Sequence, residues 1–154
     1  MRIEKILKPA FAVIGKMGST DQGEGFIQAL WAEASAHFAE VAPLAKRDEQ
    51  GNPVGVWGAM SDFSLSFRPW ENGFSRGLYL AGVECNENAE PPAGWTKWIV
   101  PGFEYLRAEN DCADVFPKTL RFMEENGLSL AGAAHDFTDP ATGKGYVLFP
   151  LRKL

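Results

Sequence analysis

The sequence predicts an α+β fold in which duplicated β-α-β-β units form a pseudo-two-fold antiparallel sheet with two main helices and a central cleft. Three observations predict it: two amphipathic helical segments each lie between segments of strand character, a hexapeptide recurs, and one linker-like stretch divides the chain. The 154 residues have the usual length of one domain. We therefore expect a single domain over 1–154, with half-repeats at 1–86 and 94–154.

The first half reads as strand, helix, strand, strand. Its first segment is rich in apolar and branched residues, as is typical of a strand, and Pro9 near its start indicates an edge or a strand beginning. Apolar residues then recur at helical spacing up to Pro43, which ends the helix. The expected elements are a strand at 6–18, a helix from Ile27 to Val41, and strands at 54–63 and 76–84.

The second half repeats this order after the linker-like stretch 86–94. Its first strand is broken or bulged at Pro101, and Gly127 is well placed to end its helix in the left-handed conformation. The expected elements are a strand from Trp95 to Glu109, a helix from Asp114 to Asn126, and strands at 129–137 and 146–151.

An internal repeat connects the two halves. The hexapeptide Gly-Ala-Met-Ser-Asp-Phe at 58–63 reappears as Gly-Ala-Ala-His-Asp-Phe at 132–137, with four of six positions identical. The same order of elements surrounds both copies, which favours duplication. One such unit cannot cover its own sheet, so we expect the halves to pack about a pseudo-two-fold axis. A groove where the halves meet would be a natural binding place for a small molecule.

Charge and composition exclude several classes of partner and site. The net charge of −5 argues against nucleic acid as a direct partner. No apolar signal core or long uncharged apolar run occurs, so we expect a cytoplasmic protein with no membrane contact. Cys85 and Cys112 have no zinc spacing and are expected to be reduced thiols. The only histidines, His37 and His135, accompany no metal motif, so we expect no metal and no cofactor.

Aromatic residues make up 12% of the chain, more flat apolar surface than a core of this size needs. Strand alternation places several of them, with a serine and a histidine, on matching faces of the two repeated strands. Core packing is the alternative for each tryptophan, and a hydrogen-bonded structural role is the alternative for the histidine. The predicted ligand-binding residues are Trp57, Ser61, Phe63, Trp70, Tyr79, Trp95, Trp98, Glu104, Tyr105, His135 and Phe137.

Four short motifs occur in a characteristic order and spacing, as part of a similarity that covers nearly the whole chain. They are Leu-Tyr-Leu-Ala-Gly-Val-Glu at 78–84, Pro-Pro-Ala-Gly-Trp at 91–95, Val-Pro-Gly-Phe-Glu-Tyr at 100–105 and Leu-Phe-Pro-Leu at 148–151. With the duplication, they resemble the GyrI-like effector-binding domain. The resemblance implies a stand-alone, multidrug-binding type of module related to the effector domains of AraC-type and MerR-type transcription regulators.

One motif of that family is altered. A glutamate in a Glu-x-Tyr motif before the last hairpin reaches the family's central cleft and meets flat cations. Here His135 stands at the glutamate's position and Phe137 at the tyrosine's. The change argues against a strong preference for cations, and against transfer of the hydrolase activity that some stand-alone members perform with a Glu and Tyr pair. Glu84, or Glu104 with Tyr105, could supply the missing acid.

Two classes of function follow. The first is a module that senses or sequesters a small hydrophobic or aromatic molecule in a central cleft; the alternative is a hydrolase of reactive, cyclopropanoid-type molecules there. The sequence assigns no catalytic residue, and it leaves open a homodimer or a partner regulator.

We expect His135 to face the cleft and, with an ordinary pKa of about 6.5, to make ligand affinity change between about pH 5.5 and 7.5. The interpretation of Asp62 and Asp136 is that they cap turns.

Overall fold

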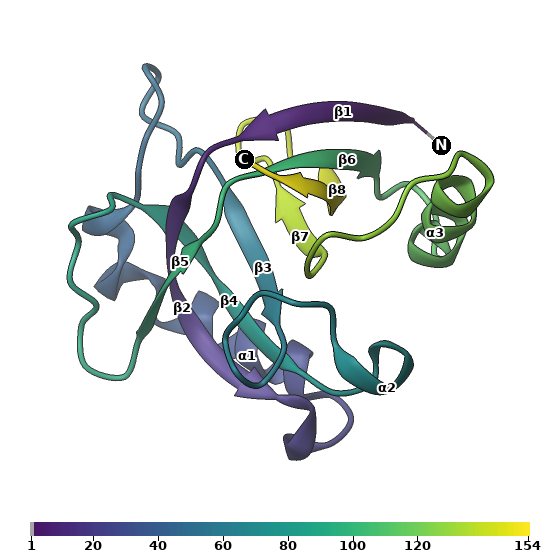
Figure 1. Cartoon of the computed structure of the whole chain (residues 1–154). Helices are drawn as coiled ribbons and strands as arrows, with labels where there is room; N and C mark the ends of the chain where they lie inside the picture. The colour runs from purple at the N-terminus through teal and green to yellow at the C-terminus, as the bar shows by residue number, and fades with distance from the viewer. Residues whose placement is uncertain (1) are drawn as a thin grey trace.

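The computed structural model describes residues 2–154, and its eight strands form one antiparallel sheet (Figure 1). The strand order is β1-β6-β8-β7-β3-β4-β2-β5. The predicted α+β class is confirmed. The strands are β1 (Ile3–Lys8), β2 (Phe11–Ser19), β3 (Val56–Ser61), β4 (Leu78–Cys85), β5 (Thr96–Val100), β6 (Phe103–Glu109), β7 (His135–Thr138) and β8 (Gly145–Lys153); the helices are α1 (Phe26–Ala36), α2 (Glu71–Phe74) and α3 (Val115–Glu125).

The strand order has matching halves on either side of the β3–β7 pair. On one side lie β4, β2 and β5, and on the other lie β8, β6 and β1. Each β-α-β-β unit, β2-α1-β3-β4 or β6-α3-β7-β8, therefore supplies three adjacent strands. The strand before each unit crosses over: β1 pairs with β6, and β5 pairs with β2. The two crossing points touch, because a Cβ on Gly102 would lie 3.1 Å from the Cα of Pro9.

Three hydrophobic clusters lie on the two faces of the sheet. On one face, α1 covers a cluster of the first unit and α3 covers a cluster of the second. The third cluster takes residues from both units and joins them. We call it the central aromatic cluster; its rings are Phe11, Trp57, Phe67, Trp98, Phe103, Tyr105, Phe137 and Tyr146, together with the His135 imidazole that contacts two of them.

The structure corrects three expected elements. The strand expected at 6–18 is two strands, β1 and β2, which are separated at Pro9 and pair with different partners. The strand expected at 129–137 pairs only from His135, because the preceding backbone bonds elsewhere: Ala131 N–H donates to the carbonyl of Pro150, and Ala133 N–H to that of Phe67. The two copies of the hexapeptide therefore differ in structure. The helix expected to reach Val41 ends at Ala36, and two short 3₁₀ turns follow it.

Two further findings concern the described part of the chain as a whole. Both cysteines are free thiols, with Cys85 buried and Cys112 partly exposed. Within residues 2–154, no helix has the length and apolar character needed to cross a membrane.

Candidate functional site

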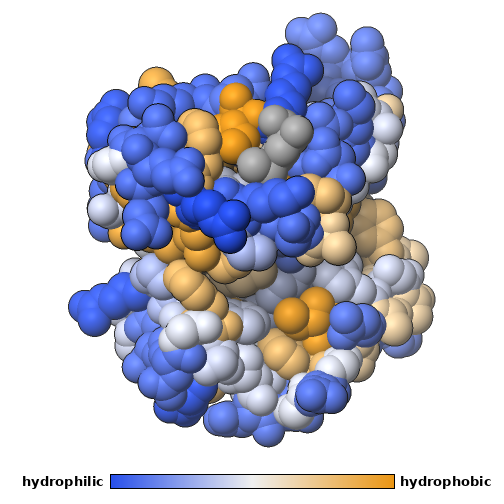
Figure 2. All heavy atoms as spheres, turned by 90° about the vertical axis from the view of Figure 1, so that its right-hand side faces the viewer, coloured by the Kyte–Doolittle hydropathy of each residue, from blue (hydrophilic) through white to orange (hydrophobic). Residues whose placement is uncertain are grey.

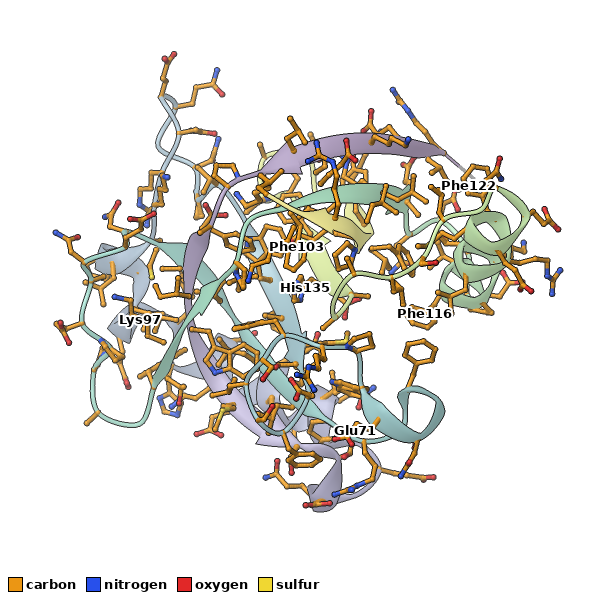
Figure 3. All side chains as sticks on the ribbon, viewed as in Figure 1. Glu71, Lys97, Phe103, Phe116, Phe122 and His135 are labelled. Carbon is orange, nitrogen blue, oxygen red and sulfur yellow. The ribbon has the colours of Figure 1, made fainter. Side chains whose placement is uncertain are left out.

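The middle of the central aromatic cluster is built around His135. Its ring stands edge-on to Trp57 from β3 and to Tyr105 from β6, with centroid distances of 6.4 and 6.2 Å. The imidazole and Trp57 are each 1% exposed, and Tyr105 is fully buried. Figure 3 shows His135 and Phe103 near the middle of the molecule, whereas Phe116 lies out on α3. Residues from both halves thus meet at this imidazole.

A backbone hydrogen bond settles the tautomer of His135. The N–H of Met60 donates to Nδ1 at 3.0 Å, so Nδ1 carries no proton and the neutral ring holds its proton on Nε2. Burial lowers the pKa of His135 to about 3. The expectation of a cleft-facing group that titrates near pH 6.5 is therefore not met; the structural alternative describes this histidine. Its Nε2–H is a fixed donor at neutral pH.

Two buried polar atoms in the cluster lack hydrogen-bond partners. Trp98 Nε1 and Tyr105 Oη make no hydrogen bond within residues 2–154. Burial raises the pKa of Tyr105, which keeps its hydroxyl protonated. A buried polar group without a partner costs about 1–3 kcal/mol, and such groups are rare in folded proteins. Both atoms belong to the central aromatic cluster, and the Tyr105 ring also contacts His135, which indicates a place where polar atoms of a bound molecule could be accommodated.

The cluster is closed at one end by the loop after β3. We call residues 62–68 the cover loop. Phe67 packs edge-on against Trp98 with ring centroids 5.7 Å apart, and its N–H donates to Ser61 Oγ at 3.0 Å. Phe67 and Leu65 both have φ of 57°, a left-handed conformation that is rare for large apolar residues. Such conformations cost roughly 1–3 kcal/mol each and occur most often at functional sites.

Asp62 holds the cover loop in shape. Its carboxylate accepts hydrogen bonds from the hydroxyls of Ser61 and Ser64 and from the backbone N–H groups of Ser66 and Arg68. Burial raises the pKa of Asp62, but the hydrogen bonds outweigh it and leave the pKa below its ordinary value. Asp62 is thus the turn cap that the sequence indicated, and it supports the segment that carries Phe67.

A polar recess lies at the other end of the cluster, with a volume of about 390 Å³. Trp57 and Phe137 form part of its wall. Glu84 lies here at 3% exposure, accepting from Trp57 Nε1 at 3.0 Å and paired with Lys8 Nζ at 3.2 Å. The other charged groups in the wall are Lys46 and Arg107, so cations outnumber carboxylates in this recess.

The opposite face of the sheet carries a different polar group. Tyr79 Oη donates to Asp136 Oδ2 at 3.0 Å and accepts from Trp31 Nε1 at 3.1 Å. The tyrosine crosses β3 at Gly58, where any Cβ would overlap its hydroxyl. Burial raises the pKa of Asp136. Sequence reasoning assigned Asp136 to a turn, although alternation from His135 already placed it on the face opposite the cluster.

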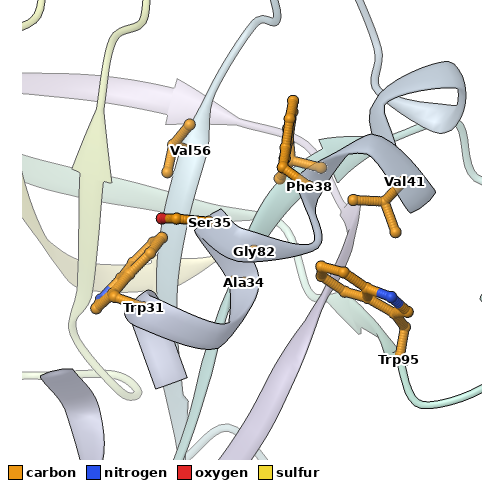
Figure 4. A pocket seen from close by; sticks show the side chains of 9 residues that line it. Trp31, Ala34, Ser35, Phe38, Val41, Val56, Gly82 and Trp95 are labelled. Carbon is orange, nitrogen blue, oxygen red and sulfur yellow. The ribbon is translucent and has the colours of Figure 1, made fainter. Parts of the chain in front are cut away.

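Two apolar recesses open on this outer face. One, of about 360 Å³, lies beside α1 and is walled by Trp31, Phe38 and Trp95 (Figure 4). The second, of about 470 Å³, lies between the halves and is lined by Trp70 and Phe116 among others. Figure 2 shows the side of the molecule that carries α2 and α3, with a furrow between the upper and lower parts and apolar atoms beside it.

The structure divides the eleven predicted ligand-binding residues into groups. Tyr79 and Trp95 belong to the cluster under α1, whereas Trp98 and Tyr105 belong to the central aromatic cluster. Glu104 pairs with Arg152 at 3.2 Å beyond the bulge in β6 and does not supply an acid to the cluster. Phe63 lies under the Arg76 guanidinium, and Trp70 donates to the Leu78 carbonyl. Those in or directly against the central aromatic cluster are Trp57, Ser61, Trp98, Tyr105, His135 and Phe137.

Comparison with known proteins gives fold relatives only. No family model matches the chain, and no curated protein does. Among solved structures, SAV2435 bound to tetraphenylphosphonium is 11% identical, with a TM-score of 0.63 over 99% of this chain and 94% of that one. The C-terminal domain of EcmrR is 11% identical, with a TM-score of 0.64 over 99% and 98%. The integron cassette protein VCH_CASS2 from the mobile metagenome of Vibrio cholerae is 16% identical, with a TM-score of 0.59 over 97% and 95%.

These neighbours share the overall fold of this chain. Each match covers almost the entire chain, so the likeness includes both β-α-β-β units and the crossing strands. At these identities it establishes the architecture, and the site rests on the geometry described above. The chain has the GyrI-like effector-binding fold.

Proposed function

We propose that this protein is a small-molecule-binding module that senses or sequesters apolar, aromatic compounds in the central aromatic cluster. The ligand would displace Phe67 and lie against Trp98, Tyr105 and His135. The observation that carries the proposal is the pair of buried donors without partners, Trp98 Nε1 and Tyr105 Oη, beneath a loop with left-handed apolar residues. A fold relative that binds the aromatic cation tetraphenylphosphonium adds support.

Binding to this cluster can be tested with the tryptophans themselves. Flat aromatic compounds should quench tryptophan fluorescence, and Phe67→Ala should tighten binding because less packing is lost when the cover loop moves. Phe74→Ala is the matched control: it lies in the same β3–β4 connection but packs on Phe116, in the recess between the halves. If Phe74→Ala changes affinity while Phe67→Ala does not, the ligand binds in that outer recess and the proposed site is wrong.

The alternative function, a hydrolase of reactive small molecules, is favoured by one contact. Asp136, a carboxyl whose pKa is raised by burial, touches the hydroxyl of Tyr79, so an acid and a phenol are paired. General acid catalysis needs such a tuned group next to the substrate. Incubation with cyclopropane-containing aromatic compounds, followed by mass spectrometry, tests this alternative. Product that forms with the wild type and not with Asp136→Asn would support hydrolysis; unchanged compounds would reject it.

Any role in transcription is proposed to pass through a second protein. The net charge of −5 disfavours direct contact with nucleic acid, so a bound ligand would be read by a partner regulator. Co-purification with and without an aromatic ligand would test whether such a partner depends on the bound state.

A further inference from the structure

The unpaired polar atoms of the central aromatic cluster are chiefly hydrogen-bond donors, although the Tyr105 hydroxyl oxygen can also accept. Trp98 Nε1 can only donate, and Tyr105 Oη is a protonated hydroxyl that donates readily. His135 also donates, because Met60 N–H occupies Nδ1 and leaves the proton on Nε2. Three donors from three different strands, β5, β6 and β7, therefore belong to one buried cluster.

The carboxylates near the cluster are already engaged. Glu84 accepts from Trp57 Nε1 and pairs with Lys8. The Asp62 carboxylate is used by the cover loop, and Asp136 lies on the opposite face with Tyr79. A cation entering the cluster would meet no unneutralised negative charge, and its burial without one is very costly.

The charged residues around the cluster also disfavour a cationic ligand. The recess beside Trp57 and Phe137 contains Lys8, Lys46 and Arg107 in its wall, against the single carboxylate Glu84. A Lys8–Glu84 pair is internally neutral, and Arg107 pairs with Glu4 on the surface. Lys46 has no carboxylate partner among residues 2–154 and leaves a net positive charge at this end of the cluster.

From these contacts we infer that the ligand is a flat aromatic molecule carrying a hydrogen-bond acceptor, such as a carbonyl or carboxylate, and that aromatic cations are disfavoured. This inference rests on the proposed function. The inferred preference is opposite to the charge of tetraphenylphosphonium, the cation to which SAV2435 is bound in its solved structure. The physical reason is that an acceptor satisfies donors that otherwise stay unpaired, whereas a ligand without one leaves them unpaired.

Pairs of ligands that are similar in shape but differ in polarity test the inferred preference separately from binding itself. Fluorenone and fluorene differ in one carbonyl, and 2-naphthoate and 2-naphthylmethylammonium differ in charge. Isothermal titration at pH 7.5 should give fluorenone a Kd roughly tenfold below that of fluorene, as a hydrogen bond to a buried donor predicts. The naphthoate should bind more tightly than the naphthyl cation by a similar factor.

Substitutions test whether the buried donors cause the preference for ligands with an acceptor. Tyr105→Phe should bring the fluorenone and fluorene Kd values closer together, whereas Tyr79→Phe, which removes a hydroxyl on the opposite face, should keep the preference. Circular dichroism and thermal melting confirm that each variant folds. Equal binding of fluorenone and fluorene, or tighter binding of the cation, would overturn the inferred polarity and leave the proposed function standing. If no compound binds to the wild type or to Phe67→Ala, the proposed function fails, and the inferred polarity fails with it.

Discussion

The backbone N–H of Met60 donates to Nδ1 of His135 at 3.0 Å, at the point where the β3–β7 ladder stops. The backbone pairing between these strands ends at Gly58 and Asp136. Beyond it, the imidazole takes the place of a carbonyl and satisfies a buried N–H that would otherwise lack a partner. This bond holds the two halves together and also sets the tautomer on which the character of the cluster depends.

Loss of the imidazole should weaken the fold in a pH-dependent way. In the folded protein the pKa of His135 is about 3, below its ordinary value of 6.5, so between these pH values the unfolded chain binds a proton that the folded protein does not. Stability should therefore fall as the pH is lowered from about 6.5 towards 3, by up to about 1.4 kcal/mol per pH unit from this group. Urea unfolding at pH 7 and pH 5 measures this slope.

His135→Gln removes that titration and should make the slope shallower. At pH 7 the substitution should lower the free energy of unfolding by about 1–3 kcal/mol when the glutamine amide does not accept the hydrogen bond from Met60 N–H. His37→Gln, at an exposed position near the end of α1, is the control and should leave both slope and stability close to wild type. Equal slopes in the wild type and His135→Gln would contradict the burial of a neutral imidazole.

Removal of the Tyr105 hydroxyl should stabilise the protein. This hydroxyl is buried without a partner, so Tyr105→Phe relieves its desolvation and should raise the free energy of unfolding by about 1 kcal/mol. Tyr79→Phe should do the reverse, because it deprives Trp31 and Asp136 of their hydrogen-bond partner. Thermal melting of both variants checks the opposite signs. A destabilised Tyr105→Phe would mean that this hydroxyl is satisfied in solution.

The cover loop should loosen when its carboxylate is removed. Asp62→Ala breaks the hydrogen bonds from Ser66 N–H and Arg68 N–H, so these amides should exchange with deuterium much faster than in the wild type. Asp48→Ala is a matched control, since Asp48 likewise accepts two backbone N–H groups, but in a surface turn away from the cluster. Unchanged exchange at the cover loop in Asp62→Ala would show that packing of Phe67 alone keeps it closed.

A methyl group at Gly58 should disrupt the outer polar group. The Cβ of Gly58→Ala would overlap the Tyr79 hydroxyl, so the tyrosine must leave Asp136, with an expected loss of roughly 1–3 kcal/mol for overpacking. Gly145→Ala is the control, because the nearest atom to its Cβ, Cβ of Asn110, is 3.8 Å away. Chemical denaturation of both variants gives the comparison. A Gly58→Ala protein as stable as the wild type would exclude close packing of Tyr79 at this position.

The sequence by itself determined the order of elements and much of the face on which each side chain lies. Helical and strand periodicities are local, so they identified α1, α3 and the strands around them. Alternation also put Trp57, His135 and Phe137 on one face, since neighbouring positions in a strand point to opposite sides. The sequence marked the interruption at Pro101 but merged β1 and β2 into one strand across Pro9, because the separate partners of the two strands are long-range contacts.

Only the tertiary structure decided what those residues contact. The burial of His135 depends on Trp57 from β3 and on Tyr105 from a distant strand, which no local pattern specifies. The contact of Tyr79 with Asp136 requires β4, β3 and β7 to be adjacent, with glycine in the middle strand. Long-range strand pairing sets the burial, tautomer and partners of a polar group, and these determine whether it is a free donor, a bound acceptor or a structural anchor.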